Sequence, residues 1–341
     1  MNPPKALNVW VVDDDASIRW VLERALKQGG MRTTAFDQAD TVLTALRREE
    51  PDVLLTDIRM PGRDGHWLAS NIRHDAPETA VIMASGVQEV DSAASGLRQG
   101  IVDYLTKPFA LERLRESVSR GVEWHKAARD TRLWRETLEG EVAARRQVLS
   151  DAVDSLIIDN DADLDVLLCV LTNADREAYA HAYRVAGLAA TVGRAMDVDE
   201  EELRRLERAA LVHDVGKFAM PDAVLRKPAP LTVEEQNLIR QHPRIGSELF
   251  VGVPYLSAAA ELVRDACERV DGRGYPNGTP AADVALGARI IAVADAFDTM
   301  TRPRVFRTAV SPAEALAELQ RCAGTQFDPA VVAAFKGIVQ Q

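Results

Sequence analysis

The first 122 residues alternate between short apolar segments and longer amphipathic ones, and this alternation constrains the fold more than any other feature. Segments typical of strands lie at 8–12, 32–36, 53–56, 80–84 and 102–106. Segments with helical periodicity lie at 17–28, 38–49, 65–74, 90–99 and from 110 onward. Strands that alternate with helices indicate a parallel sheet, because each crossover helix covers one face of it. We therefore predict an α/β domain with a doubly wound, five-stranded parallel sheet.

Charged and hydroxyl side chains follow four of these strands. Asp13 and Asp14 follow the first, Asp57 the third, Ser85 the fourth and Lys107 the fifth. The carboxyl ends of parallel strands meet at one edge, where ligands bind. Carboxylates gathered there repel one another unless a hard cation lies between them, and Mg²⁺ prefers oxygen ligands. Asp57 could then accept a phosphoryl group, with Lys107 and Ser85 contacting its oxygens. Each residue also has a simpler interpretation, as a helix cap or a turn, but five in register make coincidence a poor explanation.

The runs Trp10–Asp15, Ser17–Leu26, Asp57–Gly62 and Asp103–Phe109 resemble the receiver domain of response regulators, most closely its nitrogen-regulation branch. The resemblance spans residues 6 to about 122 and implies a flavodoxin-like fold. It also implies a sensor histidine kinase as partner and a cis peptide bond before Pro108. The implied site residues are the phosphoacceptor Asp57, the magnesium ligands Asp13 and Asp14 (with Asp57), and the switch residues Ser85, Tyr104 and Lys107.

Helical patterning continues after Phe109 through a charge-rich segment that reaches about Leu149. Its apolar residues Leu133, Leu138, Val142 and Leu149 are spaced irregularly, so the segment fits either a short coiled-coil dimer seam or a solvated single helix. We expect a receiver domain at 1–122, a helical linker at 123–150 and a second domain at 151–341. A homodimer is the expected oligomer.

The second half of the chain is patterned as helix throughout. One apolar helical segment ends at His213-Asp214, which places His213 on its core-facing side. Adjacent imidazole and carboxylate groups can hold a divalent metal, although an isolated pair also fits a core histidine and a capping aspartate. His181 lies one helical turn after Glu177, and Asp295 lies in an almost wholly apolar segment, where a carboxylate needs a partner. Capping boxes are predicted at Thr232/Glu235 and Ser311/Glu314.

The order His181, His213-Asp214, Asp295 is similar to the ligand order of HD metal-dependent phosphohydrolases. With His242-Pro243, the loop Asp271–Pro276 and Thr325–Pro329, the chain from about Asp175 onward resembles the HD-GYP family. That resemblance implies an all-α domain that hydrolyses cyclic di-GMP at a centre of two or three metals, often iron or manganese. The residues implied are His213, Asp214 and Lys217 for catalysis; Glu177, His181, His213, Asp214, His242 and Asp295 for metal; and Asp271, Gly272, Gly274, Tyr275, Pro276, Arg304 and Arg307 for substrate. Arg304 and Arg307 fit solvated helix-end arginines nearly as well.

The sequence departs from the family at one motif. The family has His-His-Glu shortly before the Gly-Tyr-Pro loop, whereas this chain has Ala266-Cys267-Glu268. The missing histidines would bind one metal together with Asp214 and His242. Cys267 could bind as a thiolate or serve as a small core residue. We therefore expect an incomplete second metal position and weak or absent hydrolysis. The alternatives are an inactive pseudo-enzyme that binds a nucleotide or a protein, or a site with one or two metals acting on another phosphoester.

Composition limits the remaining possibilities. The net charge of -11 argues against a nucleic-acid partner and against binding to an anionic membrane. No apolar run is long enough to span a bilayer. The cysteines Cys169, Cys267 and Cys322 are scattered, which fits a reducing compartment. We predict a cytoplasmic protein without nucleic-acid binding or membrane insertion.

Overall fold

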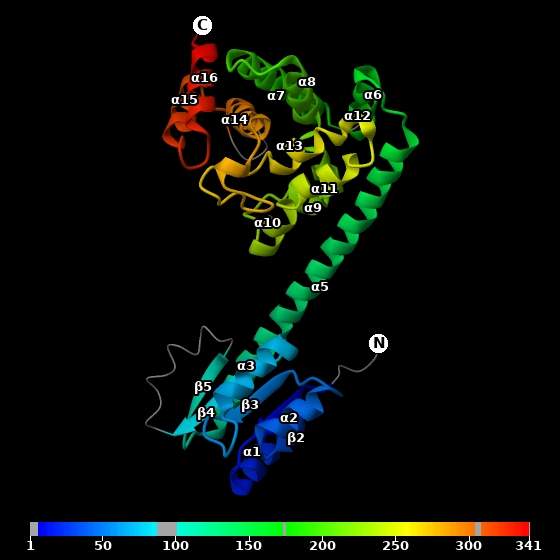
Figure 1. Ribbon diagram of the computed structural model, residues 1–341. Coiled ribbons are helices and arrows are strands. Elements are labelled where there is room, and N and C mark those ends of the chain that lie inside the picture. The colour runs from blue at the N-terminus through cyan, green and yellow to red at the C-terminus, as the bar shows by residue number, and fades with distance from the viewer. Residues whose placement is uncertain (1–5, 87–100, 173–174, 304–307, 341) are drawn as a thin grey trace. The chain divides into compact units, whose positions relative to one another are not determined.

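The computed structural model divides into two compact units, Met1–Arg135 and Glu136–Gln341 (Figure 1). The division falls inside the segment that the sequence analysis assigned to the linker. Helix α5 (Leu111–Ser155) contributes residues to both units. The structure describes residues 6–86, 101–172, 175–303 and 308–340.

The first unit is built on a five-stranded parallel sheet with the strand order β2-β1-β3-β4-β5. This order is the doubly wound topology, so the predicted α/β fold is confirmed. The predicted helix at 90–99 lies outside the described residues. The strands are β1 (Asn8–Val12), β2 (Arg32–Phe36), β3 (Val53–Asp57), β4 (Ala80–Gly86) and β5 (Ile101–Lys107), and the helices before α5 are α1 (Ala16–Gln28), α2 (Ala39–Leu46) and α3 (Gly65–Asp75).

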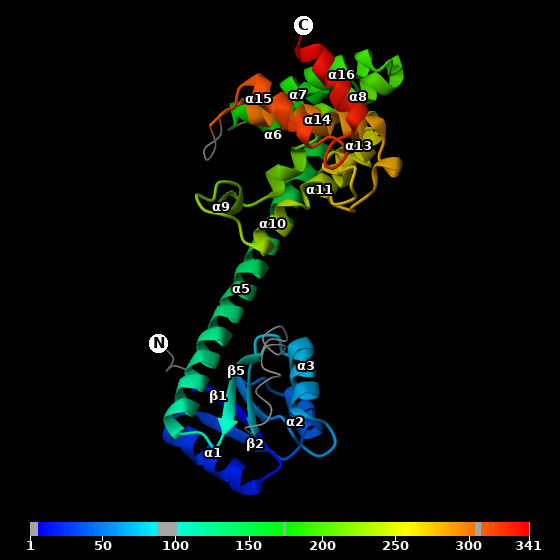
Figure 2. The same cartoon turned by 90° about the vertical axis from the view of Figure 1, so that its left-hand side faces the viewer.

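Both faces of the sheet are covered by helices, as Figure 2 shows for α2 and α3 on one side. Successive side chains of a strand point to opposite faces. Trp10 and Val12 accordingly pack in the cluster that includes residues of α2 and α3, whereas Val9 and Val11 pack with residues of α1 and α5. A strand buried on both faces must be apolar throughout, which explains the continuous apolar runs in the sequence.

The second unit is formed by helices, as predicted for this half of the chain. Both predicted capping boxes are present, at the first turns of α10 (Val233–Ile239) and α15 (Pro312–Arg321). After the C-terminal part of α5 the elements are α6 (Asp161–Leu171), α7 (Arg176–Ala195), α8 (Glu200–Val212), η3 (Val215–Ala219), α9 (Asp222–Leu225), α10 (Val233–Ile239), α11 (His242–Phe250), α12 (Pro254–Ser257), α13 (Ala260–Asp265), η4 (Ala281–Asp283), α14 (Leu286–Thr301), α15 (Pro312–Arg321) and α16 (Pro329–Val339).

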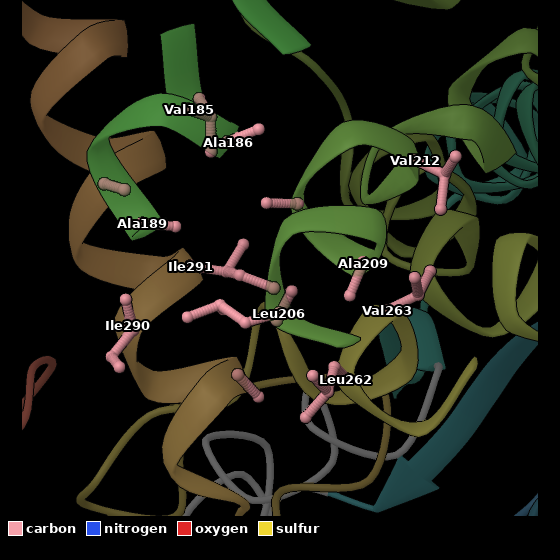
Figure 3. Packing of buried hydrophobic residues seen from close by; sticks show 14 of the residues in the cluster. Val185, Ala186, Ala189, Leu206, Ala209, Val212, Leu262, Val263, Ile290 and Ile291 are labelled. Carbon is pink, nitrogen blue, oxygen red and sulfur yellow. The ribbon is translucent and has the colours of Figure 1, made fainter. Parts of the chain in front are cut away.

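Four helices of this unit, α7, α8, α13 and α14, share an apolar core (Figure 3). Small side chains such as Ala189 of α7 and Ala209 of α8 are fully buried there and allow the helix backbones to approach closely. Larger residues, including Leu206 and Ile291, fill the space between the helices. Close packing of this kind holds neighbouring helices in one arrangement. It therefore fixes the relative positions of α7, α8 and α14, the elements that carry or precede His181, His213 and Asp295.

The C-terminal part of α5 packs inside the second unit. Leu138, Val142 and Leu149 are buried in a cluster with residues of η3, α9, α10 and α11. Arg145 adds a hydrogen bond from its guanidinium to the carbonyl oxygen of Met220, at 3.1 Å. The structure thus corrects both sequence-based interpretations for these three apolar residues, because they belong to a core within the chain.

Among the described residues, no helix combines the length and the apolar character needed to cross a membrane.

Candidate phosphoacceptor and metal centres

The carboxyl edge of the receiver-like sheet brings Asp13, Asp57 and Lys107 together, as the sequence predicted. The Lys107 ammonium lies 2.6 Å from Oδ2 of Asp13 and 2.5 Å from Oδ1 of Asp57. These residues end or follow β1, β3 and β5, so the register of the parallel sheet places them at one point. The Lys107–Pro108 peptide bond is cis, which confirms the expectation from the resemblance.

The other predicted residues of this edge occupy different environments. Asp14 is exposed, and Ser85 is buried near the end of β4. The hydroxyl of Tyr104 is buried and has no hydrogen-bond partner within the described ranges. Asp15 caps α1 by accepting the Ser17 backbone N–H at 2.7 Å, so this third aspartate of the run has a structural role.

Electrostatics at the edge favour a bound cation. Burial raises the pKa of Asp57, although the hydrogen bond from Lys107 opposes that shift. Burial also disfavours charge on Lys107, but Asp13 and Asp57 outweigh it and raise the lysine pKa. A divalent cation would keep Asp57 ionised, and ionised Asp57 is the form that attacks phosphorus. The oxygens of Asp13, Asp14 and Asp57 suit Mg²⁺.

In the second unit, His181, His213 and Asp295 form a cluster whose three candidate ligand atoms all lie within 4.8 Å of one another. They come from α7, from the C-cap residue that follows α8, and from α14. Nε2 of His181 is 3.2 Å from Oδ1 of Asp295, and Nε2 of His213 is 3.9 Å from the same oxygen. Two imidazoles and a carboxylate at these separations can share one metal ion.

The histidine rings are oriented by hydrogen bonds at Nδ1. His213 donates to the carbonyl oxygen of Ala210 at 2.7 Å, and His242 donates to that of Ile239 at 2.9 Å. A carbonyl only accepts, so Nδ1 of each ring carries a proton and Nε2 is the atom that faces the cluster. Nε2 of His213, like that of His181, is buried without a hydrogen bond in the described part of the chain. An unsatisfied buried nitrogen fits a metal ligand.

Asp214 lies between the histidines. Its Oδ1 is 3.4 Å from Nε2 of His213 and 3.5 Å from Nε2 of His242. Its Oδ2 is 2.6 Å from the ammonium of Lys217 and 3.8 Å from Nε2 of His181. A carboxylate placed in this way can bridge two ions.

Charges within the cluster stabilise one another. Burial alone would raise the pKa of Asp214, but Lys217, His213 and His242 hold it well below its usual range. Burial lowers the pKa of His181, but Asp295 and Asp298 outweigh it and raise the value to about 9. At neutral pH a metal ion must therefore displace a proton from this imidazole.

The residues expected at the second metal position differ from those of the first cluster. Ala266 is 7% exposed and packs in the main apolar core, so its methyl group supplies no ligand. Sγ of Cys267, however, lies 3.9 Å from Nε2 of His242. Cys267 is half-buried, and its sulfur is the atom that faces the ring of His242.

Two carboxylates of α7 and α14 differ from the prediction. Glu177 is not brought into the cluster; its side chain is 65% exposed and lies 2.6 Å from the guanidinium of Arg184. Asp298, which the sequence analysis missed, is buried and accepts a 2.7 Å hydrogen bond from Nδ1 of His181. The sequence did indicate that Asp298 could lie near the cluster, because it follows Asp295 by one helical turn.

The segment that follows the loop 271–276 is anchored by Glu268. The buried carboxylate of Glu268 accepts the backbone N–H groups of Asn277, Gly278 and Thr279, at 2.8 to 3.1 Å. The ring centroid of Tyr275 is 6.2 Å from that of His242, so Tyr275 reaches the site.

The other predicted substrate contacts of this loop have local roles. Asp271 pairs with Arg269 at 2.7 Å, and Gly272 has a φ of 71°, which favours glycine. A Cβ at Gly274 would lie 2.4 Å from the backbone nitrogen of Arg269. The peptide bond before Pro276 is cis. Arg304 and Arg307 lie outside the described residues.

Known proteins resemble both units. Residues 165–331 match the family model of the HD domain, and residues 9–119 match that of the response regulator receiver domain. The chain is 31% identical, over 332 residues, to the cyclic di-GMP phosphodiesterase response regulator RpfG of Xanthomonas campestris, an alignment that covers 96% of this chain and 86% of RpfG. The chain belongs to the response regulators that join a receiver domain to an HD domain.

Of two further relatives, one aligns with both domains and the other with the receiver domain alone. A cyclic di-GMP phosphodiesterase of Thermotoga maritima is 27% identical over 335 residues, covering 96% of this chain and 89% of that protein. The receiver domain is 48% identical over 114 residues to the transcriptional regulator NtrC of Escherichia coli, covering 33% of this chain and 24% of NtrC. The expected similarity of the receiver domain to the nitrogen-regulation branch is thereby confirmed.

Proposed function

We propose that this response regulator accepts a phosphoryl group on Asp57 and thereby controls an HD-GYP-type output domain that binds metal and cyclic di-GMP but hydrolyses the nucleotide slowly. The observation that carries the proposal is the convergence of His181, His213 and Asp295, with Asp214 beside them. The relative RpfG, named as a cyclic di-GMP phosphodiesterase response regulator, supports the choice of nucleotide.

A second candidate function is a pseudo-enzyme that binds a nucleotide or a protein partner without turnover. The buried methyl group of Ala266 favours it, because that position supplies no metal ligand. Two-metal hydrolysis needs both ions to activate the water and to stabilise the leaving oxygen. The two candidates differ in one measurable quantity, the rate of cyclic di-GMP hydrolysis above background.

Metal content tests the HD centre. The double substitution His213→Ala, Asp214→Ala removes one buried imidazole and the carboxylate between the histidines, so bound Fe or Mn is expected to fall by at least half. Elemental analysis of the purified proteins measures this fall, with circular dichroism to verify folding. The control is His74→Ala, since the side chain of His74 is 89% exposed. Equal metal content in the double variant and the unaltered protein would refute the site.

Phosphorylation tests the receiver. With Mg²⁺ and a small phosphodonor, the unaltered chain is expected to gain one phosphoryl group, and Asp57→Asn to gain none, because an amide is not a nucleophile for phosphorus. Intact-protein mass spectrometry detects the added mass. Asp40→Asn, which changes an exposed carboxylate in the first turn of α2, serves as control and should behave as the unaltered chain. Equal phosphorylation of Asp57→Asn would remove Asp57 from this role.

The partners proposed with this function are a sensor histidine kinase and a second copy of the chain. The aspartyl phosphate adds negative charge at the edge where Ser85 and Tyr104 lie, which gives the receiver a local change to transmit. We propose that the dimer population or geometry responds, in a cytoplasmic protein without nucleic-acid or membrane partners.

A further inference from the structure

Three histidine rings, those of His181, His213 and His242, face the cluster, and the first is held differently from the other two. Nδ1 of His213 and Nδ1 of His242 each donate to a backbone carbonyl oxygen three residues earlier in the chain. Nδ1 of His181 instead donates to Oδ2 of Asp298 at 2.7 Å, and Asp298 lies on another helix, α14. The local backbone therefore orients two of the rings, whereas the orientation of His181 depends on a side chain from α14.

The carboxylate of Asp298 is itself held in place. It is buried, and the guanidinium of Arg184 binds both of its oxygens. Nε of Arg184 donates to Oδ1 at 2.6 Å, and Nη2 donates to Oδ2 at 3.0 Å. A guanidinium that binds through two nitrogens fixes both the position and the tilt of a carboxylate. Because Arg184 and His181 both lie on α7, this pair joins α7 to α14 beside the metal ligands.

Glu177 forms the outer end of this network. Its Oε1 accepts a 2.6 Å hydrogen bond from Nη2 of Arg184, and its side chain is mostly exposed. The inner end is Nε2 of His181, which lies 3.2 Å from Oδ1 of Asp295. Glu177 is therefore separated from the cluster by two intervening side chains, although it shares a helix with His181.

The charges in the network fix the role of each nitrogen of the His181 ring. Burial alone would raise the pKa of Asp298, but His181 and Arg184 outweigh it and hold the value at about 2. An ionised carboxylate only accepts hydrogen bonds, so Nδ1 of His181 carries a proton. Nε2 is then the atom that faces the cluster, and it has no hydrogen-bond partner among the residues that the structure describes.

We propose that Asp298 and Arg184 are positioning residues of the metal centre, which together hold the ring of His181 with Nε2 toward the ion. Glu177 acts on the centre only through Arg184. A carboxylate behind a metal-bound imidazole fixes the orientation of the ring and raises its basicity as a ligand. The inference rests on the proposed metal binding by the His181 cluster, and it goes further by assigning roles to side chains that do not touch the ion.

Metal affinity measured along the network tests the assignment. Zn²⁺, used as the probe, is titrated into the full-length protein in competition with a chromogenic chelator. Asp298→Ala is expected to weaken binding about 10–100-fold, because the imidazole loses the group that orients it. Arg184→Gln is expected to weaken binding by a smaller factor, since His181 keeps its acceptor. Glu177→Gln should have the smallest effect of the three.

Two comparisons separate positioning from a merely structural role. Asp298→Asn keeps an oxygen that can accept from Nδ1 of His181, so it should bind Zn²⁺ about fivefold more tightly than Asp298→Ala. Arg194→Gln is the matched control for the arginine; it also lies on α7, but its side chain is 60% exposed and pairs with Glu207, so it should bind as the unaltered protein does. Thermal denaturation of the metal-free proteins measures folding separately from binding.

The outcomes distinguish this inference from the proposed function. A folded Asp298→Ala that binds Zn²⁺ as tightly as the unaltered protein overturns the inference alone. A loss in Glu177→Gln as large as that in Asp298→Ala also overturns it, because Glu177 would then be a direct ligand. An unaltered protein that binds no metal overturns the proposed function itself. If Asp298→Ala does not fold, weaker binding by both Asp298→Asn and Arg184→Gln supports the inference, and unchanged binding by both overturns it.

Discussion

The double substitution Ala266→His, Cys267→His is expected to raise the rate of cyclic di-GMP hydrolysis by about two to four orders of magnitude. These are the positions where the HD-GYP family has its histidine pair. The change would give the second metal four protein ligands, counting His242 and Asp214. An increase of this size corresponds to about 3–5 kcal/mol of additional transition-state stabilisation.

The expected increase in rate depends on the positive charge that a second metal ion presents to its bound water. Two imidazoles in place of a methyl group and a thiol would complete the ligand set of this ion, and a firmly held ion makes its bound water ionise more readily. Asp214 already lies between His213 and His242, at 3.4 and 3.5 Å, and can connect the two positions. The natural chain lacks the two imidazole ligands that the family has at the positions of Ala266 and Cys267.

The measurement is single-turnover hydrolysis of cyclic di-GMP by the metal-loaded proteins, with metal content determined on the same samples. Ala266 packs in the apolar core, so its enlargement is expected to cost about 1–3 kcal/mol of stability. The control Ala266→Asn, Cys267→Asn adds polar side chains of similar length that are poor ligands and should stay slow. Rapid hydrolysis by the unaltered protein would show that the two positions matter less than proposed.

The receiver domain could be predicted almost completely because independent signals coincide there. Strands β1 and β2 have the expected bounds, 8–12 and 32–36. Parallel register then brings the residues that follow the strands to one edge, so Asp13, Asp57 and Lys107 meet without further information. In this domain the topology of the sheet determines where a residue at the end of a strand lies, so the local sequence predicts its tertiary position.

In the HD domain the ligand types were predictable, but their partners were not. The burial of His181 and His213 follows from helical periodicity, but the partner of Nδ1 of His181 does not, since Asp298 lies 117 residues further along the chain. Glu177 is the opposite case, a predicted metal ligand that does not reach the cluster. It shares a helical face with His181, yet its carboxylate turns to Arg184.

The packing of α5 could not be predicted from the sequence either, because it also depends on residues far along the chain. Leu138, Val142 and Leu149 form an apolar strip, and a strip of this kind fits a second helix in a dimer or a groove in the same domain equally well. The surface formed by Met220, Val224 and Leu238 decides between them, and it is assembled from segments far along the chain.

Gly216→Ala is expected to destabilise the HD domain by about 3 kcal/mol or more. An added Cβ would lie 2.0 Å from the carbonyl oxygen of His242 and 2.9 Å from the backbone nitrogen of Gly246. Both neighbours are backbone atoms of α11, so no side-chain rotation relieves the contact. Either η3 moves and displaces Asp214 and Lys217, or α11 moves and displaces His242.

Calorimetry of the full chain should show the transition of the HD domain lowered by about 6–12 °C in Gly216→Ala, with the receiver transition unchanged. Metal content should fall as well, because either movement separates Asp214 from His242. Gly187→Ala is the matched control; it lies exposed in α7 with open space around its Cβ position and should gain about 0.5–1 kcal/mol. If Gly216→Ala kept both its melting temperature and its metal, the close contact between η3 and α11 would not be what positions the centre.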